Sequence, residues 1–261
     1  MDLNLAGKTA LVTGGSKGIG AGVALRLASE GCQVHIAART EADLQMTASR
    51  IAEQTGAEMT PHVADLSQSS AITGLLDATG CPDILVNNAG AIPAGDIAAM
   101  DEARWREAWE LKVFGYINMC RAVHDAMKAR GSGVIINVTG LAADRTDAGY
   151  IAGTAGNASL NAFTRALGGR SLRDGVRVLA VSPGPVETER LVTLMRARAE
   201  AEYGDPERWQ GYLGNLPRGR AATVAEVADV VTFLASDRAA GVSGTVVTVD
   251  GGHGSNQGSF T

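Results

Sequence analysis

The sequence predicts an α/β protein: a single domain in which helices cover both faces of a doubly wound, seven-stranded parallel sheet. Three observations predict this fold class. Short apolar runs rich in Val, Ile and Leu alternate with longer helical patterns, which is typical of parallel strands covered on both faces. A glycine-rich turn follows the first apolar run, in a chain with 33 glycines among 261 residues. With 45% hydrophobic and 20% charged residues, the chain is able to bury one sizeable core.

Seven apolar runs have the length and continuity of buried strands. In chain order we expect strands over Thr9–Thr13, Gln33–Ala38, Met59–Val63, Ile84–Asn87, Val134–Val138, Val176–Val181 and Thr245–Val249.

Helical patterns lie between these strands and supply the right-handed crossovers that parallel neighbours require. We expect helices over Gly20–Ser29, Glu41–Gln54, Asp101–Lys128, Tyr150–Leu172 and Val224–Ala235. In the last of these, Val224, Val227 and Val231 recur on one side at helical spacing. Residues 187–222 follow a strand but contain no further strand. We therefore expect one domain over residues 1–261, with 187–222 as an insertion over the sheet.

Charge and cysteine usage exclude several classes of protein. The formal net charge is −5 with the signs interspersed, so no basic face for nucleic acid or lipid is indicated. The three cysteines form no C-x-x-C pair and the four histidines show no metal spacing, so neither a disulfide framework nor a metal site is expected. The first 13 residues lack the features of a signal peptide and no apolar run approaches 18 residues. We expect a cytoplasmic protein without a membrane partner.

The turn after the first strand has the features of a phosphate-binding loop. It reads TGGSKGIG from Thr13 to Gly20 and leads directly into a helical pattern. Glycines at such a turn adopt conformations closed to other residues and let a phosphate approach the main chain. The helix N-terminus then offers free N–H groups and a positive dipole end. A tight turn without a ligand is the alternative explanation, but the strand–turn–helix context favours dinucleotide binding.

The glycine spacing, G-x-x-x-G-x-G, resembles that of the short-chain dehydrogenase/reductase family, and the likeness covers essentially the whole chain. Four further segments carry it: Asp65-Leu66, Asn87-Asn88-Ala89-Gly90, Pro183-Gly184 with Thr188, and Val249-Asp250-Gly251-Gly252. The resemblance implies a Rossmann-type fold and a nicotinamide dinucleotide. The resemblance and the charge at the end of the second strand together imply a set of cofactor-binding residues. They are Gly14, Ser16, Lys17, Gly18, Ile19, Gly20, Arg39, Asp65, Leu66, Asn88, Ala89, Gly90, Pro183, Gly184, Val186 and Thr188.

The end of the second strand favours NADP over NAD. An acidic residue there would bind a ribose 2′-hydroxyl and repel a 2′-phosphate. This chain instead has Ala37-Ala38-Arg39-Thr40, and an arginine suits bidentate phosphate binding. Lys17 in the glycine turn adds a second cation. The alternative is that both residues are ordinary surface charges.

The catalytic pattern of the family is incomplete in this chain. Members usually combine Asn, Ser, Tyr and Lys, the last two in a Y-x-x-x-K motif, and Tyr150 stands at the matching place. Four residues on is Thr154 instead of lysine. Gly140 aligns with the serine, which leaves Thr139 as the nearest hydroxyl, and Lys112 aligns with the asparagine. Only the tyrosine of the set is retained.

A threonine cannot take over the electrostatic role of the missing lysine. Lowering a tyrosine pKa from about 10 to about 7 requires roughly 4 kcal/mol of phenolate stabilisation. An ammonium about 5 Å away supplies roughly 3 kcal/mol at an effective dielectric near 20, whereas a neutral hydrogen bond supplies only about 1. We hypothesise that Lys112 provides a relocated cation, with Tyr150 as acid/base, Thr139 polarising a carbonyl, and Thr154 binding ribose. The alternative is that Lys112 is a solvated helix residue.

Three functions remain open on the sequence. The first is an NADP-dependent oxidoreductase acting on a carbonyl or alcohol. The second is an NADP-binding sensor or scaffold without redox turnover, suggested by the lost serine and lysine. The third is non-redox chemistry in the same pocket, such as lyase or epimerase work, although the intact glycine turn argues against a version without cofactor.

Residues 187–222 are expected to form a substrate lid, by resemblance, and a symmetric homodimer or homotetramer is expected on the same ground. An apolar and aromatic lining suits a hydrophobic or ring-containing substrate; a helix pair packing on its own core is the alternative. The lining candidates are Leu191, Leu194, Met195, Tyr203, Trp209, Tyr212 and Leu213. Nearby carboxylates should offset five arginines of the segment, so no anionic substrate is indicated. The five arginines are Arg190, Arg196, Arg198, Arg208 and Arg218.

Overall fold

The computed structural model describes residues 1–256 and shows a seven-stranded sheet whose neighbouring strands are all parallel. The strand order is β3-β2-β1-β4-β5-β6-β7, so the chain runs outward from β1 first in one direction and then in the other. The strands are β1 Thr9–Thr13, β2 Gln33–Ala38, β3 Met59–Val63, β4 Ile84–Asn87, β5 Gly133–Val138, β6 Val176–Pro183 and β7 Val246–Val249. All seven predicted strands are present, with ends that differ by two residues at most.

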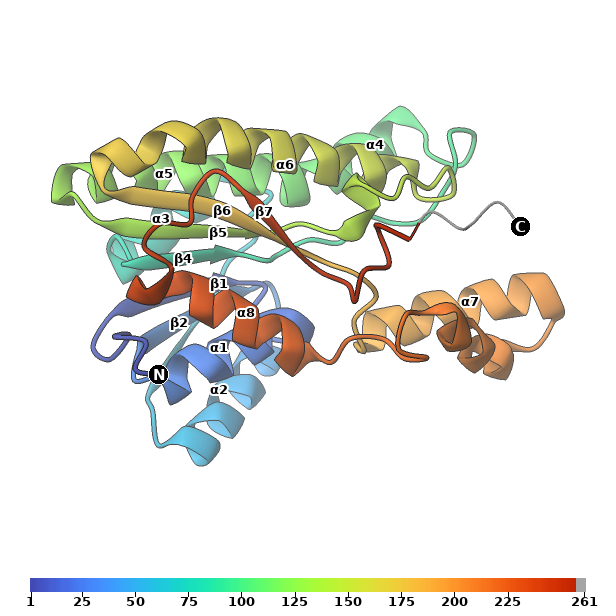
Figure 1. Ribbon diagram of the computed structural model, residues 1–261, viewed down its shortest axis with the longest axis horizontal. Coiled ribbons are helices and arrows are strands. Elements are labelled where there is room, and N and C mark those ends of the chain that lie inside the picture. Colours follow the sequence, from blue (N-terminus) through green and yellow to red (C-terminus); the bar gives the residue numbers. More distant parts are fainter. Residues whose placement is uncertain (257–261) are drawn as a thin grey trace.

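Helices cover both faces of the sheet, which confirms the predicted fold class (Figure 1). The α-helices are α1 Gly18–Ser29, α2 Glu41–Thr55, α3 Ser69–Thr79, α4 Glu102–Trp109, α5 Gly115–Arg130, α6 Ile151–Ser171, α7 Glu189–Tyr203 and α8 Val224–Ala235. Along β1, Ala10 and Val12 face the core under α1, α2 and α8, whereas Leu11 faces the core under α3, α5 and α6. Successive side chains of a strand point to opposite faces, so each buried strand contributes to both cores.

Two helical features depart from the sequence prediction. The helix α3 was not predicted; only Ile72 and Leu75 are buried among its 11 residues. The helix predicted over Asp101–Lys128 is divided into α4 and α5 by a five-residue π-helix, Glu110–Phe114. Such π-helical turns are rare and often occur at functional sites. This one carries Lys112.

The segment predicted as an insertion leaves the body after β6 and returns next to its starting point. Val186 and Ala222 form an isolated parallel bridge, and the Glu187 amide donates to the Ala222 carbonyl at 2.8 Å. Between them lie α7 and a 3₁₀ helix, Pro206–Asn215. Figure 1 shows this pair projecting to one side of the body, past the end of β6. We use the name lid for residues 187–222.

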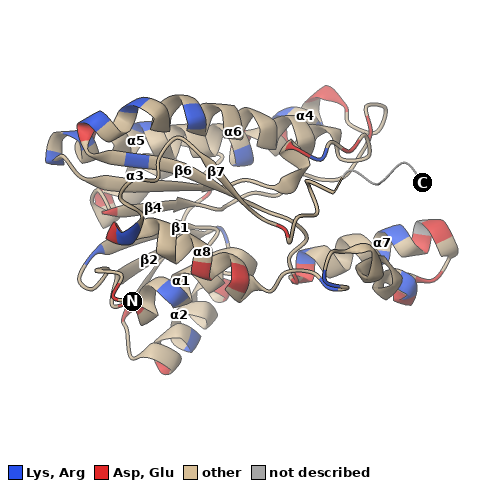
Figure 2. Cartoon of the chain, viewed as in Figure 1, with Lys and Arg blue, Asp and Glu red and all other residues tan. Residues whose placement is uncertain are grey.

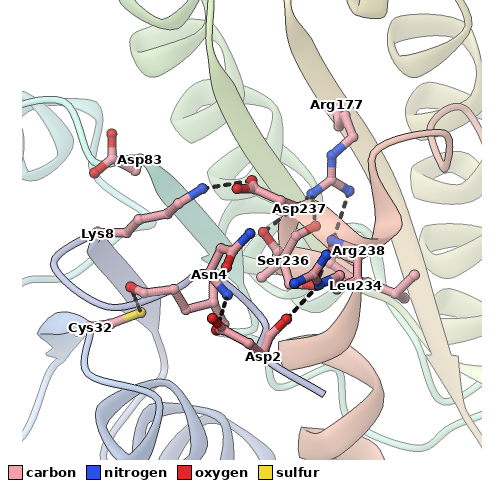
Figure 3. A network of polar contacts seen from close by, with 12 residues as sticks. Asp2, Asn4, Lys8, Cys32, Asp83, Arg177, Leu234, Ser236, Asp237 and Arg238 are labelled. Carbon is pink, nitrogen blue, oxygen red and sulfur yellow. Dashed lines mark hydrogen bonds and ion pairs between the residues drawn. The ribbon is translucent and has the colours of Figure 1, made fainter.

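At the amino ends of the strands, a network of polar contacts joins β6 to the residues at the end of α8 (Figure 3). The buried Arg177 guanidinium of β6 donates to the carbonyl oxygens of Leu234 at 2.7 Å and Ser236 at 3.0 Å. These carbonyls belong to the end of α8, where free acceptors remain. Lys8 pairs with Asp237 at 2.8 Å across the same edge. The contacts tie the last helix to the sheet.

Candidate active site

The glycine turn between β1 and α1 requires glycine at specific positions. Gly14 and Gly18 have φ angles of +64° and +54°, in the left-handed region that favours glycine. A Cβ on Gly20 would overlap the Gly14 carbonyl oxygen and the Asn88 side-chain amide. The Gly14 amide is held by the Ala37 carbonyl of β2 at 2.7 Å. The glycine turn therefore packs closely against β2 and Asn88, and a side chain at Gly14, Gly18 or Gly20 would disturb it.

The start of α1 is open to an anion. Its N-cap residue, Lys17, is extended and makes no side-chain capping bond, so the first amides of the helix keep free N–H groups. A Cβ on Gly18 would meet the Thr188 methyl group at 3.4 Å, which places Thr188 of the lid opposite the turn. An uncapped helix start beside a glycine turn fits the diphosphate of a dinucleotide. The residues present thus fit the cofactor that the sequence implies.

Asn88 and Thr13 fix the loop after β4 against the glycine turn. The Asn88 side-chain amide donates to the carbonyl oxygens of Thr13 and Gly14, both at 3.1 Å. In the other direction, the amides of Asn88 and Ala89 donate to the Thr13 hydroxyl at 2.9 and 3.1 Å. Asn88 and Thr13 thus hold the loop after β4 against the end of β1.

Arg39 and Lys17 differ in how free their charges are. Arg39 directly follows β2, is exposed and forms no ion pair within residues 1–256. Lys17 pairs with Asp43 of α2 at 3.1 Å, so part of its charge is offset. Asp65, another of the predicted cofactor-binding residues, accepts hydrogen bonds from the amide and hydroxyl of Ser67 at 3.1 and 2.8 Å.

The other cofactor candidates line the same edge. Ser16 accepts a 2.6 Å hydrogen bond at its carbonyl from Thr47, and the Gly184 amide donates to Val249 of β7 at 3.0 Å. Thr188 caps α7 by accepting from the Leu191 amide at 3.3 Å. The remaining candidates in these turns are Ile19, Leu66, Gly90, Pro183 and Val186.

Tyr150 lies at the start of α6 against the loop that follows β4. It forms a bridge with Gly95 and packs in a cluster with Ile92 and Trp109. A Cβ on Gly153 would overlap the tyrosine ring, so glycine at 153 makes room for it. Burial raises the pKa of Tyr150 above its usual value, against the effect of the neighbouring Arg190 guanidinium. The hydroxyl therefore carries its proton at neutral pH.

Lys112 is buried, with 9% of its surface exposed, so it is not a solvated helix residue. Its ammonium group donates to the Val138 carbonyl at 2.7 Å and to the Tyr116 hydroxyl at 2.9 Å. A Cβ on Gly90 would overlap its aliphatic chain. Burial, with a further contribution from Arg190, lowers the pKa of Lys112 to about 7. Among the described contacts, none joins the Lys112 nitrogen to Tyr150.

The two candidate hydroxyls are bonded to the main chain. The Thr139 hydroxyl donates to Val181 of β6 at 3.3 Å, and Thr154 donates to the Asp147 carbonyl at 3.4 Å. A Cβ on Gly140 would lie 3.4 Å from the Asn157 side-chain amide, an ordinary contact distance. There is therefore room for a Cβ at Gly140, the position that the sequence analysis matches with the serine of the family.

Sequence reasoning missed two side chains of this site. Asn157 is buried near Gly140, and its Oδ1 has no hydrogen-bond partner in the described part of the chain. Arg190 donates from Nη2 to the Ile92 carbonyl at 2.6 Å. Its positive charge acts to lower the pKa of both Tyr150 and Lys112. No family position marked either residue. The only available signal was their place, three residues after Thr154 and two after Thr188.

The lid carries both charges, as Figure 2 shows along α7. Arg196 pairs with Glu207 at 3.1 Å, and Arg198 approaches Glu202 at 3.6 Å, as the sequence predicts for the lid arginines. Arg190 and Arg208 differ, because within residues 1–256 neither forms an ion pair, and Arg208 lies over the Tyr203 ring instead. The expectation of nearby offsetting carboxylates therefore fails at these two residues.

Two further features of residues 1–256 bear on other classes of site. No helix there is both long enough and apolar enough to span a membrane. Nor does that part of the chain bring three or more His, Cys, Asp or Glu side chains together in a group that could hold a metal ion.

Comparisons with known proteins match almost the whole chain. Residues 14–254 match the family model described as "Enoyl-(Acyl carrier protein) reductase". The chain is 32% identical over 251 residues to galactitol 2-dehydrogenase (L-tagatose-forming) of Cereibacter sphaeroides, covering 95% of this chain and 96% of that protein. L-sorbose reductase from Gluconobacter frateurii, complexed with NADPH and L-sorbose, is similar with a TM-score of 0.87 and 29% identity, covering 96% and 98% of the two chains. NAD⁺-bound xylitol dehydrogenase gives 0.88 and 25%, covering 95% and 100%.

Proposed function

Because the chain belongs to the short-chain dehydrogenase/reductase family of oxidoreductases, we propose that it is an NADP-dependent oxidoreductase with Tyr150 as acid/base. Its reaction would move a hydride between nicotinamide and a carbonyl or alcohol substrate. One observation carries the proposal: Tyr150 packs in a cluster with Ile92, whose carbonyl accepts from the Arg190 guanidinium, in a chain whose glycine turn has an uncapped helix start.

NADP is the cofactor we propose, on the charge near the end of β2. Arg39 is exposed and unpaired within the described residues, so its guanidinium is free to bind a 2′-phosphate through two parallel hydrogen bonds. No carboxylate stands at this end of β2 to hold a ribose 2′-hydroxyl. The similar structures include one with NADPH and one with NAD⁺, so the charge at β2 is the argument for this chain.

When bound, the dinucleotide supplies or accepts the hydride. In the reductive direction Tyr150 gives its proton to the carbonyl oxygen, and in the oxidative direction it takes a proton from the alcohol. Because burial raises the pKa of Tyr150, the hydroxyl carries its proton at neutral pH, as the acid of the reductive direction requires. Thr139 and Thr154 remain candidate catalytic hydroxyls; to act, each has to exchange its present carbonyl partner for the substrate or the ribose.

Lys112 is one candidate for a relocated cation, although its ammonium group donates to Val138 and Tyr116. Its pKa of about 7 means that it carries a full charge only below that pH. A Lys112→Ala variant with full turnover would remove Lys112 from the chemistry and leave the rest of the proposal standing.

A hydrophobic or ring-containing carbonyl compound is the substrate class we propose, with the lid covering it. Leu191, Met195 and Trp209 of the lid are only partly exposed, and such side chains suit an apolar substrate face. Similar proteins are named for sugars and polyols. A substrate panel should therefore contain cyclic and aryl ketones beside ketoses.

The test is NADPH consumption across that panel by the wild type and Tyr150→Phe. We expect turnover of at least one ketone and a loss of at least about 100-fold in the variant, which removes the acid, with NADPH affinity unchanged. An unchanged rate in Tyr150→Phe would refute the assigned role.

A sensor or scaffold without redox turnover is the second candidate. It is favoured by Gly140 and Thr154, which stand where the family has serine and lysine. Tight NADPH binding without oxidation by any carbonyl would support it.

We also propose a cytoplasmic homodimer or homotetramer. Cys32, Cys81 and Cys120 are free thiols, which suits a reducing compartment. Phe114, between α4 and α5, leaves 45% of its surface exposed and is available to a second copy. Light scattering coupled to gel filtration measures the oligomeric state.

A further inference from the structure

We propose that Arg190 is a positioning residue that stabilises the Tyr150 phenolate from the lid, in place of the lysine absent at 154. This inference rests on the proposed function and assigns the cation that the catalytic step requires.

The guanidinium of Arg190 is fixed beside the tyrosine by a long-range contact. Arg190 belongs to the first turn of α7, and its Nη2 donates to the Ile92 carbonyl, 98 residues away, at 2.6 Å. Ile92 and Tyr150 pack in one apolar cluster. The same loop contacts the tyrosine backbone, because the Ile151 amide donates to the Gly95 carbonyl at 3.3 Å. One loop therefore holds both partners.

The charge of Arg190 is available to the site. Within residues 1–256 it has no carboxylate partner, whereas Arg196 and Arg198 on the same helix do. A guanidinium has five N–H donors, and one described contact engages Arg190. The remaining donors are free for the tyrosine oxygen, whose pKa the guanidinium lowers against the effect of burial.

The other candidates for this role are engaged elsewhere. The Lys112 nitrogen donates to Val138 and Tyr116, and Thr154 is neutral and bonded to Asp147. Ile92 and Met100 pack on the tyrosine cluster without charge, and so do Trp105 and Trp109 of α4. Among the described residues, Arg190 from the lid is the one charged group that acts on the pKa of Tyr150. Asp147 in the preceding loop accepts from the Gly149 amide at 2.8 Å through its carboxylate.

The proton balance of reduction shows where the cation acts. A C–H bond forms as the hydride reaches the carbonyl carbon, and the O–H bond of Tyr150 breaks as its proton moves to the carbonyl oxygen. A phenolate remains, and solvent returns its proton after the alcohol leaves. Arg190 keeps its own proton throughout, since its pKa lies far above neutrality. Opposite charge at close range favours the ionised tyrosine.

Because Arg190 lies in the first turn of the lid helix, its position depends on how the lid is seated on Ile92. Acid–base strength and lid closure are therefore coupled: a lid that lifts would withdraw the cation from the tyrosine and leave the hydroxyl a weaker acid.

The experiment compares Arg190→Gln, Arg190→Lys and the matched control Arg196→Gln on the same helix. We expect Arg190→Gln to lower kcat by at least about 30-fold, with KM within about threefold, because it removes phenolate stabilisation rather than substrate binding. Arg190→Lys should recover most of kcat, and Arg196→Gln should match the wild type.

A second readout does not depend on turnover. Tyrosine labelled with ¹³C at the ring carbon bearing the hydroxyl reports each phenol pKa by NMR in the NADP⁺ complex, and Tyr150→Phe assigns the signal. We expect Arg190→Gln to raise the pKa of Tyr150 by about one unit or more, a tenfold change in ionisation. An unchanged Tyr150 pKa and kcat would overturn the inference, as would a loss confined to KM. If the wild type turns over no substrate, the proposed function fails while the NMR result still decides the role of Arg190.

Discussion

The buried amine of Lys112 makes a quantitative prediction about stability. Burial lowers its pKa from 10.5 to about 7. The unfolded chain therefore keeps a proton on this lysine between these values, and the folded chain does not. Stability consequently rises with pH across this window, by up to about 1.4 kcal/mol per unit, and about 5 kcal/mol in total. Below pH 7 Lys112 is protonated in both the folded and the unfolded chain. The contribution of Lys112 to the free energy of unfolding is then constant and at its least favourable value.

The substitution Lys112→Met removes the amine and keeps the length of the side chain. The Val138 carbonyl then still accepts from the Tyr116 hydroxyl at 3.1 Å, so no buried acceptor is orphaned. The two lost hydrogen bonds are worth about 1 kcal/mol each. The burial penalty at pH 7 is about 4 kcal/mol. We expect the variant to be more stable than the wild type by about 2 kcal/mol at pH 7 and to lose this advantage by pH 9.5.

Urea unfolding at several pH values between 7 and 9.5 measures this difference for Lys112→Met and for the control Lys128→Met, whose lysine is exposed and pairs with Asp174 at 3.3 Å. Taking differences from the wild type cancels the titration of all other groups. The difference for Lys112→Met should change by about 3 kcal/mol over this range, and that for Lys128→Met should stay nearly constant. A constant difference for Lys112→Met would mean that its amine is charged throughout, and the assigned burial effect would be wrong.

Three further substitutions test the cofactor site and the frame of the fold. Arg39→Asp should weaken NADPH binding by about 100-fold and reduce the preference for NADPH over NADH, because a repelling carboxylate replaces a guanidinium that donates hydrogen bonds to the 2′-phosphate. Fluorescence titration measures both affinities, and an unchanged ratio of the two affinities contradicts the assignment. Gly20→Ala should abolish NADPH binding and destabilise the fold by at least about 2 kcal/mol through backbone overlap, whereas Gly74→Ala, where a Cβ meets nothing within 4 Å, should stabilise helix α3 by up to about 1 kcal/mol. Arg177→Met should lower stability by about 3 kcal/mol by orphaning buried carbonyls, and the exposed Arg173→Met should change it by less than about 0.5; similar melting temperatures for these two would exclude the structural role.

The fold was predictable because its signals are local. Continuous apolar strands, such as Ile84–Asn87, alternate with amphipathic helices, such as Val224–Ala235, and both have the predicted bounds. The π-helix at Glu110–Phe114 has no such signal, because its hydrogen-bond register follows from tertiary packing. A Cβ on Gly115, which follows it, would lie 3.0 Å from the Leu66 carbonyl oxygen, a contact between residues far apart in the chain.

The site was predictable only where the type of a single residue determines the local backbone conformation or the local charge. Glycines at positive φ and the exposed Arg39 follow from backbone sterics and from charge. The direction of a long side chain does not. Lys112 was predicted to extend towards Tyr150, and its described hydrogen bonds instead go to Val138 and Tyr116. Arg190 lies near Tyr150 because α7 begins beside the loop after β4, and sequence spacing contains no information on that approach.

The central claim, hydride transfer with Tyr150 as acid, is tested most directly by a single turnover with NADPH deuterated at C4 and a ketone from the panel. We predict that deuterium appears on the carbinol carbon of the product, and that Tyr150→Phe binds the same dinucleotide but transfers deuterium at least about 100-fold more slowly. Tight binding of the deuterated dinucleotide, with no deuterium in any product, would contradict the claim and leave a nucleotide-binding protein without redox turnover.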